Sequence, residues 1–166
     1  MFRAQPEHGQ QSAEPVYSGA VTSTPAERVR AARERAGLDM GEVASRLGLS
    51  FAHLRDLESF EDDVENTISI ETLRNLSLAL GVTVLFILEG ADPDVPAPRI
   101  SFSEFAARVS EAVRLAGGDV DAWGEDARWD VRPLLDDPET VWKLDVDALR
   151  DIAGAAGVDW HSVLPE

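Results

Sequence analysis

The chain has 166 residues, enough for one ordinary domain or two small ones, and contains no cysteine, which excludes disulfides and thiolate metal sites. Its formal net charge of −16 opposes binding to polyanions, because affinity for nucleic acid depends largely on neutralising phosphates. No apolar run is long enough to span a bilayer, and residues 1–23 lack the apolar core of a signal peptide. We therefore expect a soluble, cytoplasmic protein that has no contact with membranes.

Residues 1–23 are predicted to form a disordered tail, since Gln, Gly, Ser and Pro alternate there without periodicity. A first helix is expected directly after the tail. Thr24 can cap its free amides, Pro25 suits its first turn, and Glu27 completes a capping box. Gly37 marks the end of this helix.

Two short helices are predicted next, and each begins at a residue whose side chain can cap it. Asp39 opens the first, and Gly48 ends it. Ser50 opens the second, which places Leu54 and Leu57 at core spacing. Glycine between the two helices permits the tight turn with positive φ that a helix-turn-helix requires.

The acidic stretch from Glu58 to Glu65 is predicted to be a loop. Ser69 then caps a further helix, which Gly81 ends. The apolar run 82–88 fits either a short helix opened by Thr83 or a strand, because periodicity cannot distinguish the two in so short a run. These elements make up a first unit over residues 24–90.

Residues 91–99 are predicted to be a semi-rigid linker, because they contain three closely spaced prolines. Residues 100–166 then form a second helical unit, whose first helix is capped by Ser101 and runs to Ala116. Further helices are predicted over Val120–Ala127, Val131–Asp136 and Val146–Ala156, with a short turn near 161–164.

The second unit repeats the first. Ala36-Gly37-x-Asp39 recurs as Ala116-Gly117-x-Asp119, which sets a first offset in numbering between the units. After a short deletion a second, smaller offset applies, and Leu73-Arg74 recurs as Leu149-Arg150. A register that is kept on both sides of one gap predicts two copies of one small domain. The expected fold is all-α, with two tandem domains joined by the Pro-rich linker.

Residues 27–88 resemble the Cro/repressor-like helix-turn-helix family, which is also called XRE-type and is lambda-repressor-like in fold. The resemblance is carried by Val29-x-x-Ala32-Arg33-x-x-Ala36-Gly37, Val43-Ala44-x-x-Leu47-Gly48-Leu49-Ser50, Leu54-x-x-Leu57-Glu58 and the closing stretch 70–82. It implies a five-helix domain in which residues 51–58 form the helix that enters the DNA major groove.

The resemblance also implies a set of DNA-binding residues, namely Met40, Ser50, Phe51, Ala52, Arg55 and Ser59. Arg55 has the geometry to pair bidentately with a guanine edge, and Phe51 or Ala52 to touch a thymine methyl. Met40 stands where the family usually has a Gln that contacts DNA, and its thioether cannot make that contact.

The second unit departs further from the family pattern. Trp123-Gly124 replaces the Val43-Ala44 pair, and no glycine follows its second helix at the expected place. Arg132 is the only cation in its counterpart of the recognition helix. We interpret this unit as a degenerate copy that serves dimerisation or partner binding.

The leading hypothesis is a sequence-specific, DNA-binding transcriptional regulator that acts as a homodimer on a duplex operator. The alternative is an acidic protein-binding module, such as an immunity protein or an antitoxin, which neutralises a basic partner protein, with the acidic loop 61–65 as a contact or a nucleic-acid mimic. A positive stripe formed by Arg46, Arg55 and either Arg28 or Arg30 would favour DNA. A continuous negative face would favour the basic partner.

Nothing in the sequence predicts an enzyme, a cofactor or a metal site. The three histidines lie in separate segments without metal-ligand spacing. No Gly-rich phosphate loop or nucleophile elbow is present.

Overall fold

The computed structural model describes residues 23–90 and 98–165. The predicted tail, apart from Ser23, and most of the predicted linker lie outside the described residues. All regular secondary structure in the described part of the chain is helical, in agreement with the all-α prediction.

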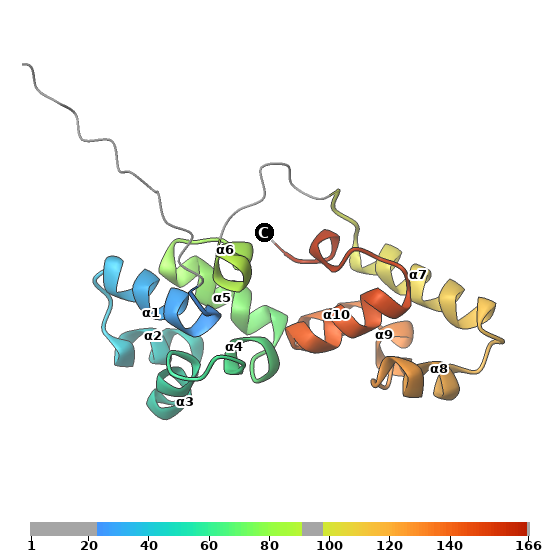
Figure 1. The fold of residues 1–166 in the computed structure, drawn as a ribbon, viewed down its shortest axis with the longest axis horizontal. Helices are drawn as coiled ribbons and strands as arrows, with labels where there is room; N and C mark the ends of the chain where they lie inside the picture. The colour runs from blue at the N-terminus through green and yellow to red at the C-terminus, as the bar shows by residue number, and fades with distance from the viewer. Residues whose placement is uncertain (1–22, 91–97, 166) are drawn as a thin grey trace, which may run out of the picture.

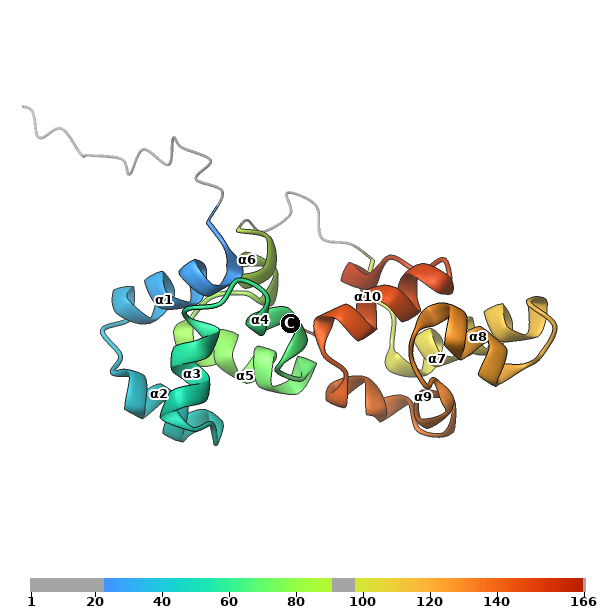
Figure 2. The same ribbon diagram turned by 60° about the horizontal axis from the view of Figure 1, so that its bottom comes forward.

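The helices gather in two groups that lie next to each other (Figures 1 and 2). The first group consists of α1 (Pro25–Arg35), α2 (Met40–Leu47), α3 (Phe51–Leu57), α4 (Asp63–Asn66), α5 (Ile70–Leu80) and α6 (Val84–Glu89). The second consists of α7 (Phe102–Leu115), α8 (Val120–Ala127), α9 (Arg132–Asp136), the 3-10 helix η1 (Pro138–Lys143), α10 (Val146–Ala155) and the 3-10 turn η2 (Trp160–Ser162).

The predicted helix starts are confirmed at the level of single hydrogen bonds. Thr24 and Glu27 form the complete capping box that opens α1. Ser50 accepts a bond from the His53 amide at 3.0 Å at the start of α3, and Ser69 caps α5 through the Thr72 amide. Each cap satisfies amides that the first turn of a helix leaves without a partner.

The run 82–88, which fitted either a helix or a strand, is helical. Thr83 accepts a hydrogen bond from the Phe86 amide at 2.9 Å and opens α6. Arg28 of α1 helps to stabilise α6. The Arg28 guanidinium donates to the carbonyls of Ile87 (2.7 Å) and Leu88 (2.6 Å) near the end of that helix. A cation at a helix C-terminus satisfies carbonyls that have no partner within the helix.

The acidic stretch 58–65 is not the single loop that the sequence predicted. Glu58 is 2% exposed and belongs to the end of α3, and residues from Asp63 onward form the short helix α4. A second departure is η1, which the sequence did not predict at all. Both elements are too short to show a helical period in the sequence.

One hydrophobic core serves both groups of helices. A single cluster of buried side chains runs from Val29 in α1 to Leu164 near the end of the described chain. It includes Leu54 and Leu73 of the first group and Leu149 and Ile152 of the second, all fully buried. A shared core supplies more buried area than a unit of this size could supply alone.

Helix bounds in the two groups correspond at the offsets that the sequence repeat sets. At the first offset, Met40–Leu47 of α2 corresponds to Val120–Ala127 of α8. At the second, the start of α5 at Ile70 corresponds to the start of α10 at Val146. Glycines with positive φ end corresponding segments, as at Gly81 (φ 66°) and Gly157 (φ 68°).

Candidate nucleic-acid interface

The segment α2–α3 folds as a tight helix hairpin around Gly48. Gly48 has φ 67° and ψ 20°, a left-handed conformation that costs glycine little. The Leu49 amide donates to the Ala44 carbonyl at 2.9 Å, and this bond closes the turn. Val43 and Ala44 are buried where the helices meet, so the predicted helix-turn-helix geometry is present.

The inner side of α3 is held by apolar packing and by one buried ion pair. Leu54 and Leu57 are fully buried. Arg33 of α1 binds the Glu58 carboxylate with two bonds, Nε–Oε1 at 2.6 Å and Nη2–Oε2 at 2.8 Å. These bonds raise the pKa of Arg33 above its ordinary value, even though burial acts in the opposite direction. The pair fixes the position of α3 against α1.

The outer side of α3 faces solvent and carries most of the residues expected to bind DNA. All of the predicted residues except Met40 are exposed along this face and at its ends, and the large side chain of Phe51 is 57% exposed. The exposed residues are Ser50, Phe51, Ala52, Arg55 and Ser59. Met40 is separate from them, since it is the first residue of α2 and packs half-buried against the core.

Arg55 is the exposed cation of α3, with 60% of its side chain accessible to solvent. Its guanidinium lies 2.9 Å (Nη2) and 3.2 Å (Nε) from Oδ1 of the neighbouring Asp56. Ser59 Oγ donates to the Arg55 carbonyl at 2.6 Å, so Ser59 completes the last turn. An exposed ion pair of this kind is worth less than about 1 kcal/mol and is easily exchanged for another partner.

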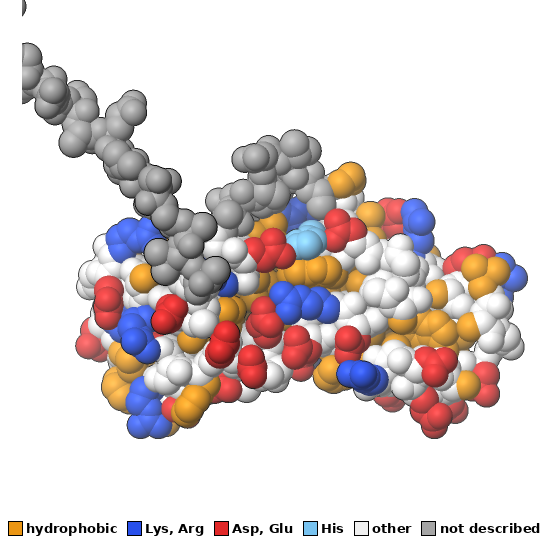
Figure 3. Space-filling view, viewed as in Figure 1, with side chains coloured by type: hydrophobic (Ala, Val, Ile, Leu, Met, Phe, Trp, Pro, Cys, Tyr) orange, Lys and Arg blue, Asp and Glu red, His pale blue; other side chains and the backbone are white. Residues whose placement is uncertain are grey.

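The positive stripe considered from the sequence is only partly present. Arg28 is 9% exposed and occupied with α6, so it cannot contribute to such a stripe. Arg30 is exposed but donates to the Glu58 carbonyl, and Arg46 pairs with Glu42 at 2.5 Å. Figure 3 shows Lys and Arg side chains at the end of the molecule that α1–α3 form, with a row of Asp and Glu side chains beside them.

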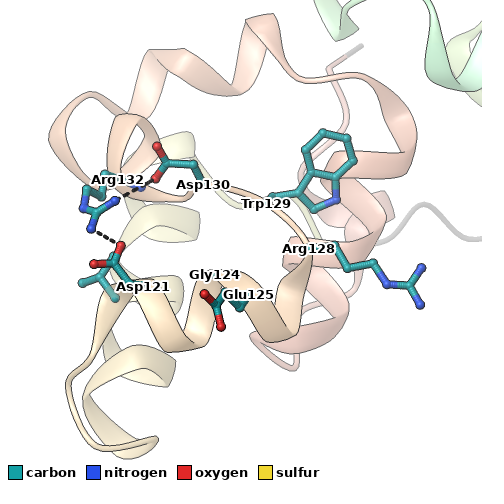
Figure 4. Close-up of a pocket in the computed structure, with 8 residues that line it drawn as sticks. Asp121, Gly124, Glu125, Arg128, Trp129, Asp130 and Arg132 are labelled. Carbon is teal, nitrogen blue, oxygen red and sulfur yellow. Dashed lines mark hydrogen bonds and ion pairs between the residues drawn. The ribbon is translucent and has the colours of Figure 1, made fainter.

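The counterpart of this hairpin in the second group is α8–α9, which borders an open depression of about 650 Å³ (Figure 4). Arg132 turns towards Asp121 and Asp130 and forms ion pairs with both. Gly124 leaves room for the chain that passes it, because a Cβ there would lie 2.7 Å from the Trp129 carbonyl oxygen. The Trp129 indole donates to Asp151 at 3.1 Å.

Two general properties of the described residues bear on function. No helix in residues 23–90 or 98–165 is long and apolar enough to cross a membrane. Within the same ranges, His, Asp and Glu side chains nowhere gather as a group that could hold a metal ion.

Sequence comparison finds a family match within the first group of helices. Residues 29–87, from α1 into α6, match the helix-turn-helix family HTH_3, in agreement with the resemblance that the sequence motifs indicated. That family is not a class of enzymes. No curated protein matches the chain.

Solved structures that are similar to the chain include two of SinR. One is a crystal structure of SinR, a master regulator for biofilm formation, in complex with DNA; it is 23% identical, covers 39% of this chain and 97% of that one, and has a TM-score of 0.33. The other is a complex of SinR protein with SinI protein; it is 20% identical, covers 61% of this chain and 89% of that one, and has a TM-score of 0.34.

Sequence reasoning missed the parts of the site that depend on tertiary approach. Arg33 and Glu58 both belong to the residues that carry the family resemblance, but nothing in the sequence predicts that the two form the buried pair that holds α3. They lie far apart in the chain, so their pairing gives no local pattern. The only signal of this pairing in the sequence was that Arg33 and Glu58, which carry opposite charges, each lie near the end of an otherwise apolar helix face.

Proposed function

We propose that this protein is a sequence-specific, DNA-binding transcriptional regulator of the Cro/XRE type, and that α3 enters the major groove. The observation that carries the proposal is the exposed outer face of α3 within a segment that matches the helix-turn-helix family. A helix held on one side by buried Leu54 and Leu57 presents its other side as a rigid unit. Rigid presentation is what base-specific contacts require.

Arg55 is the residue that we assign to base recognition. Its guanidinium can leave Asp56 at little cost, because both groups reach solvent and the pair is weak. A guanine edge offers two acceptors in the geometry of the guanidinium fork. Phe51 and Ala52 lie exposed at the start of the same helix, where they are suited to contact thymine methyl groups.

Charge limits the non-specific part of binding. The segment 25–90 carries 7 basic and 12 acidic residues, a net charge of −5. Only a few arginines remain exposed around α1–α3, namely Arg30, Arg35, Arg46 and Arg55. Each neutralised phosphate contributes about −0.9 to the slope of log affinity against log salt. We therefore expect a shallow slope of roughly −2 to −4, and specificity that rests on base contacts.

We also propose that α7–η2 is a degenerate second copy of the domain. The helix bounds that correspond at the two offsets support it. So do equivalent caps, since Asp119 opens α8 through the amides of Asp121 and Ala122, as Asp39 opens α2 through those of Gly41 and Glu42. A copy that retains such details in the same order is readily explained by duplication.

The test is a binding titration against duplexes from the region upstream of the protein's own gene, over a salt series. Arg55→Ala should weaken specific binding about 10- to 100-fold, as expected for the loss of one bidentate base contact. Arg108→Ala is the matched control, because Arg108 is equally exposed but lies on α7 in a simple pair with Glu104. If no duplex is retained even at low salt, the DNA proposal is wrong and a basic protein partner becomes the better explanation.

A further inference from the structure

The two groups of helices meet through a reciprocal interface. In the first group the contact is made by α4 and α5, and in the second by η1 and α10 (Figures 1 and 2). Helix α10 packs on α4, while α5 packs on η1. The second offset of the repeat pairs Leu73 with Leu149. At this offset α5 corresponds to α10, and the residues of α4 correspond to residues within η1. Each contact is thus the counterpart of the other.

Two equivalent arginines cross this interface in opposite directions. Arg150 of α10 binds Glu65 of α4 with two bonds of 2.8 and 3.0 Å. Arg74 of α5, its counterpart in the repeat, places its guanidinium 5.8 Å from the ring centre of Trp142 in η1. Both contacts are of recognised kinds, a bidentate ion pair and a cation–π contact. Arg150 thus reaches from the second group to α4 of the first, and Arg74 reaches from the first group to η1 of the second. Interfaces with twofold symmetry have this reciprocal arrangement.

A main-chain hydrogen bond and a histidine contact also join the two groups at this interface. The Ile70 amide, the first of α5, donates to the Leu144 carbonyl at 2.7 Å. A first-turn amide has no acceptor within its own helix, so the second group supplies what α5 lacks. At the edge, His161 Nε2 lies 2.6 Å from Glu89 Oε1 of α6. The interface therefore combines apolar, polar and backbone contacts.

We infer that the second unit occupies the face through which a lone first unit would pair with another copy, so that this chain is the one-chain equivalent of a dimer. For DNA, and resting on the proposed function, the consequence is that one monomer binds a single half-site without a palindrome. Dimeric regulators of this class bind two half-sites about one helical turn apart, because both subunits present a recognition helix.

The second unit does not offer an equivalent reading helix. The α9 segment is a short helix with Pro133 in its first turn. Its cation Arg132 is held by Asp121 of α8 and by Asp130, which precedes α9 (Figure 4). One molecule thus carries one reading surface, that of α3.

Mass in solution tests the inference without any reference to DNA. Light scattering of the full chain after gel filtration should give 18.0 kDa, the mass of one chain, across a hundredfold range of concentration. A mass of two chains would overturn the inference, because the pairing face would then not be filled internally.

Amide exchange tests the docking itself. In the full chain the Ile70 amide should exchange as slowly as the core amides of α5, since its acceptor is the Leu144 carbonyl. The Phe51 amide, first in the exposed helix α3, is the internal reference and should exchange fast. Equal, fast exchange at both positions would mean that the two units separate in solution, and would reject the inference.

The DNA consequence is tested by stoichiometry on a duplex that the protein retains. We expect one chain per duplex and unchanged affinity when bases on one side of the protected half-site are scrambled. Two chains bound across a palindrome would reject the half-site inference while leaving the proposed function intact. No binding to any duplex, together with a single-chain mass, would reject the proposed function and leave the one-chain dimer standing.

Discussion

Gly48 and Arg128 occupy equivalent positions of the two groups and adopt the same left-handed backbone conformation, with φ 67° and 65°. Both end the second helix of their group. Arg128 is the only non-glycine residue of the described chain with positive φ. The same turn conformation is therefore present in both groups, and the arginine that adopts it in the second group carries backbone strain.

Arg128→Gly should stabilise the protein by about 0.5–1 kcal/mol. Relief of the left-handed strain is worth roughly 1–2 kcal/mol, and the extra freedom that glycine gives the unfolded chain takes back about 0.4–1 kcal/mol. Gly48→Ala is the mirror-image control and should destabilise by a similar amount, since an added Cβ there meets no atom within 4 Å and only φ is at issue. Urea denaturation measures both. A loss of stability in Arg128→Gly would contradict the prediction.

Glu58→Gln should be strongly destabilising, by about 3–5 kcal/mol, because it leaves the Arg33 guanidinium without its counter-charge in a site where its side chain is only 12% exposed. Glu104→Gln removes a carboxylate from an exposed pair of the same type and should change stability by less than about 0.5 kcal/mol. Thermal unfolding of both variants checks the difference. Similar values for the two would show that the buried pair does not hold α3.

Stability should depend on the protonation of His161. Burial acts to lower the pKa of His161, but its hydrogen bonds to Glu89 and Asp159 outweigh burial and raise it above the ordinary value. Because folding raises the pKa of His161, its protonated form stabilises the folded protein. This stabilisation is complete below about pH 6.5 and is lost as pH rises through the folded-state pKa. The bond to His161 also lowers the pKa of Asp159, so that carboxylate stays charged in the same window.

The measurement is the free energy of unfolding at pH 6 and pH 8.5 for the parent and for His161→Gln. The parent should lose up to about 1 kcal/mol more than the variant over this range, since the contacts are partly exposed. Identical pH dependence of the two proteins would rule out the histidine as the cause.

Asp56→Asn should strengthen DNA binding severalfold. The substitution removes one negative charge beside the reading face and frees Arg55 from its present partner. Asp126→Asn removes a charge from an exposed position on α8 and is the matched control for net charge alone. Fluorescence anisotropy with one duplex compares them. An equal gain for both variants would assign the effect to overall charge and not to Arg55.

Local chemistry made much of the fold predictable from the sequence. The caps at Thr24, Ser50 and Ser69 lie next to the helices that they open, so their roles depend on a few neighbouring residues. The roles of Arg28 and Glu58 did not follow in this way, because their partners are brought close only when α1, α3 and α6 pack together. Of the candidate site, the exposed face of α3 was predictable, and the contact that draws Arg30 to the Glu58 carbonyl was not.

The contacts of Arg74 and Arg150 have a consequence for how such a protein can change. In a homodimer one gene encodes both sides of the axis, so every substitution appears twice and an interface must tolerate both copies. Here Arg74 lies beside Trp142 and Arg150 binds Glu65, and a symmetric interface between identical subunits would not contain two such different contacts. In a chain that joins two copies, as we propose for this one, each half is free from the constraint of matching the other, so that one half can diverge from its neighbour.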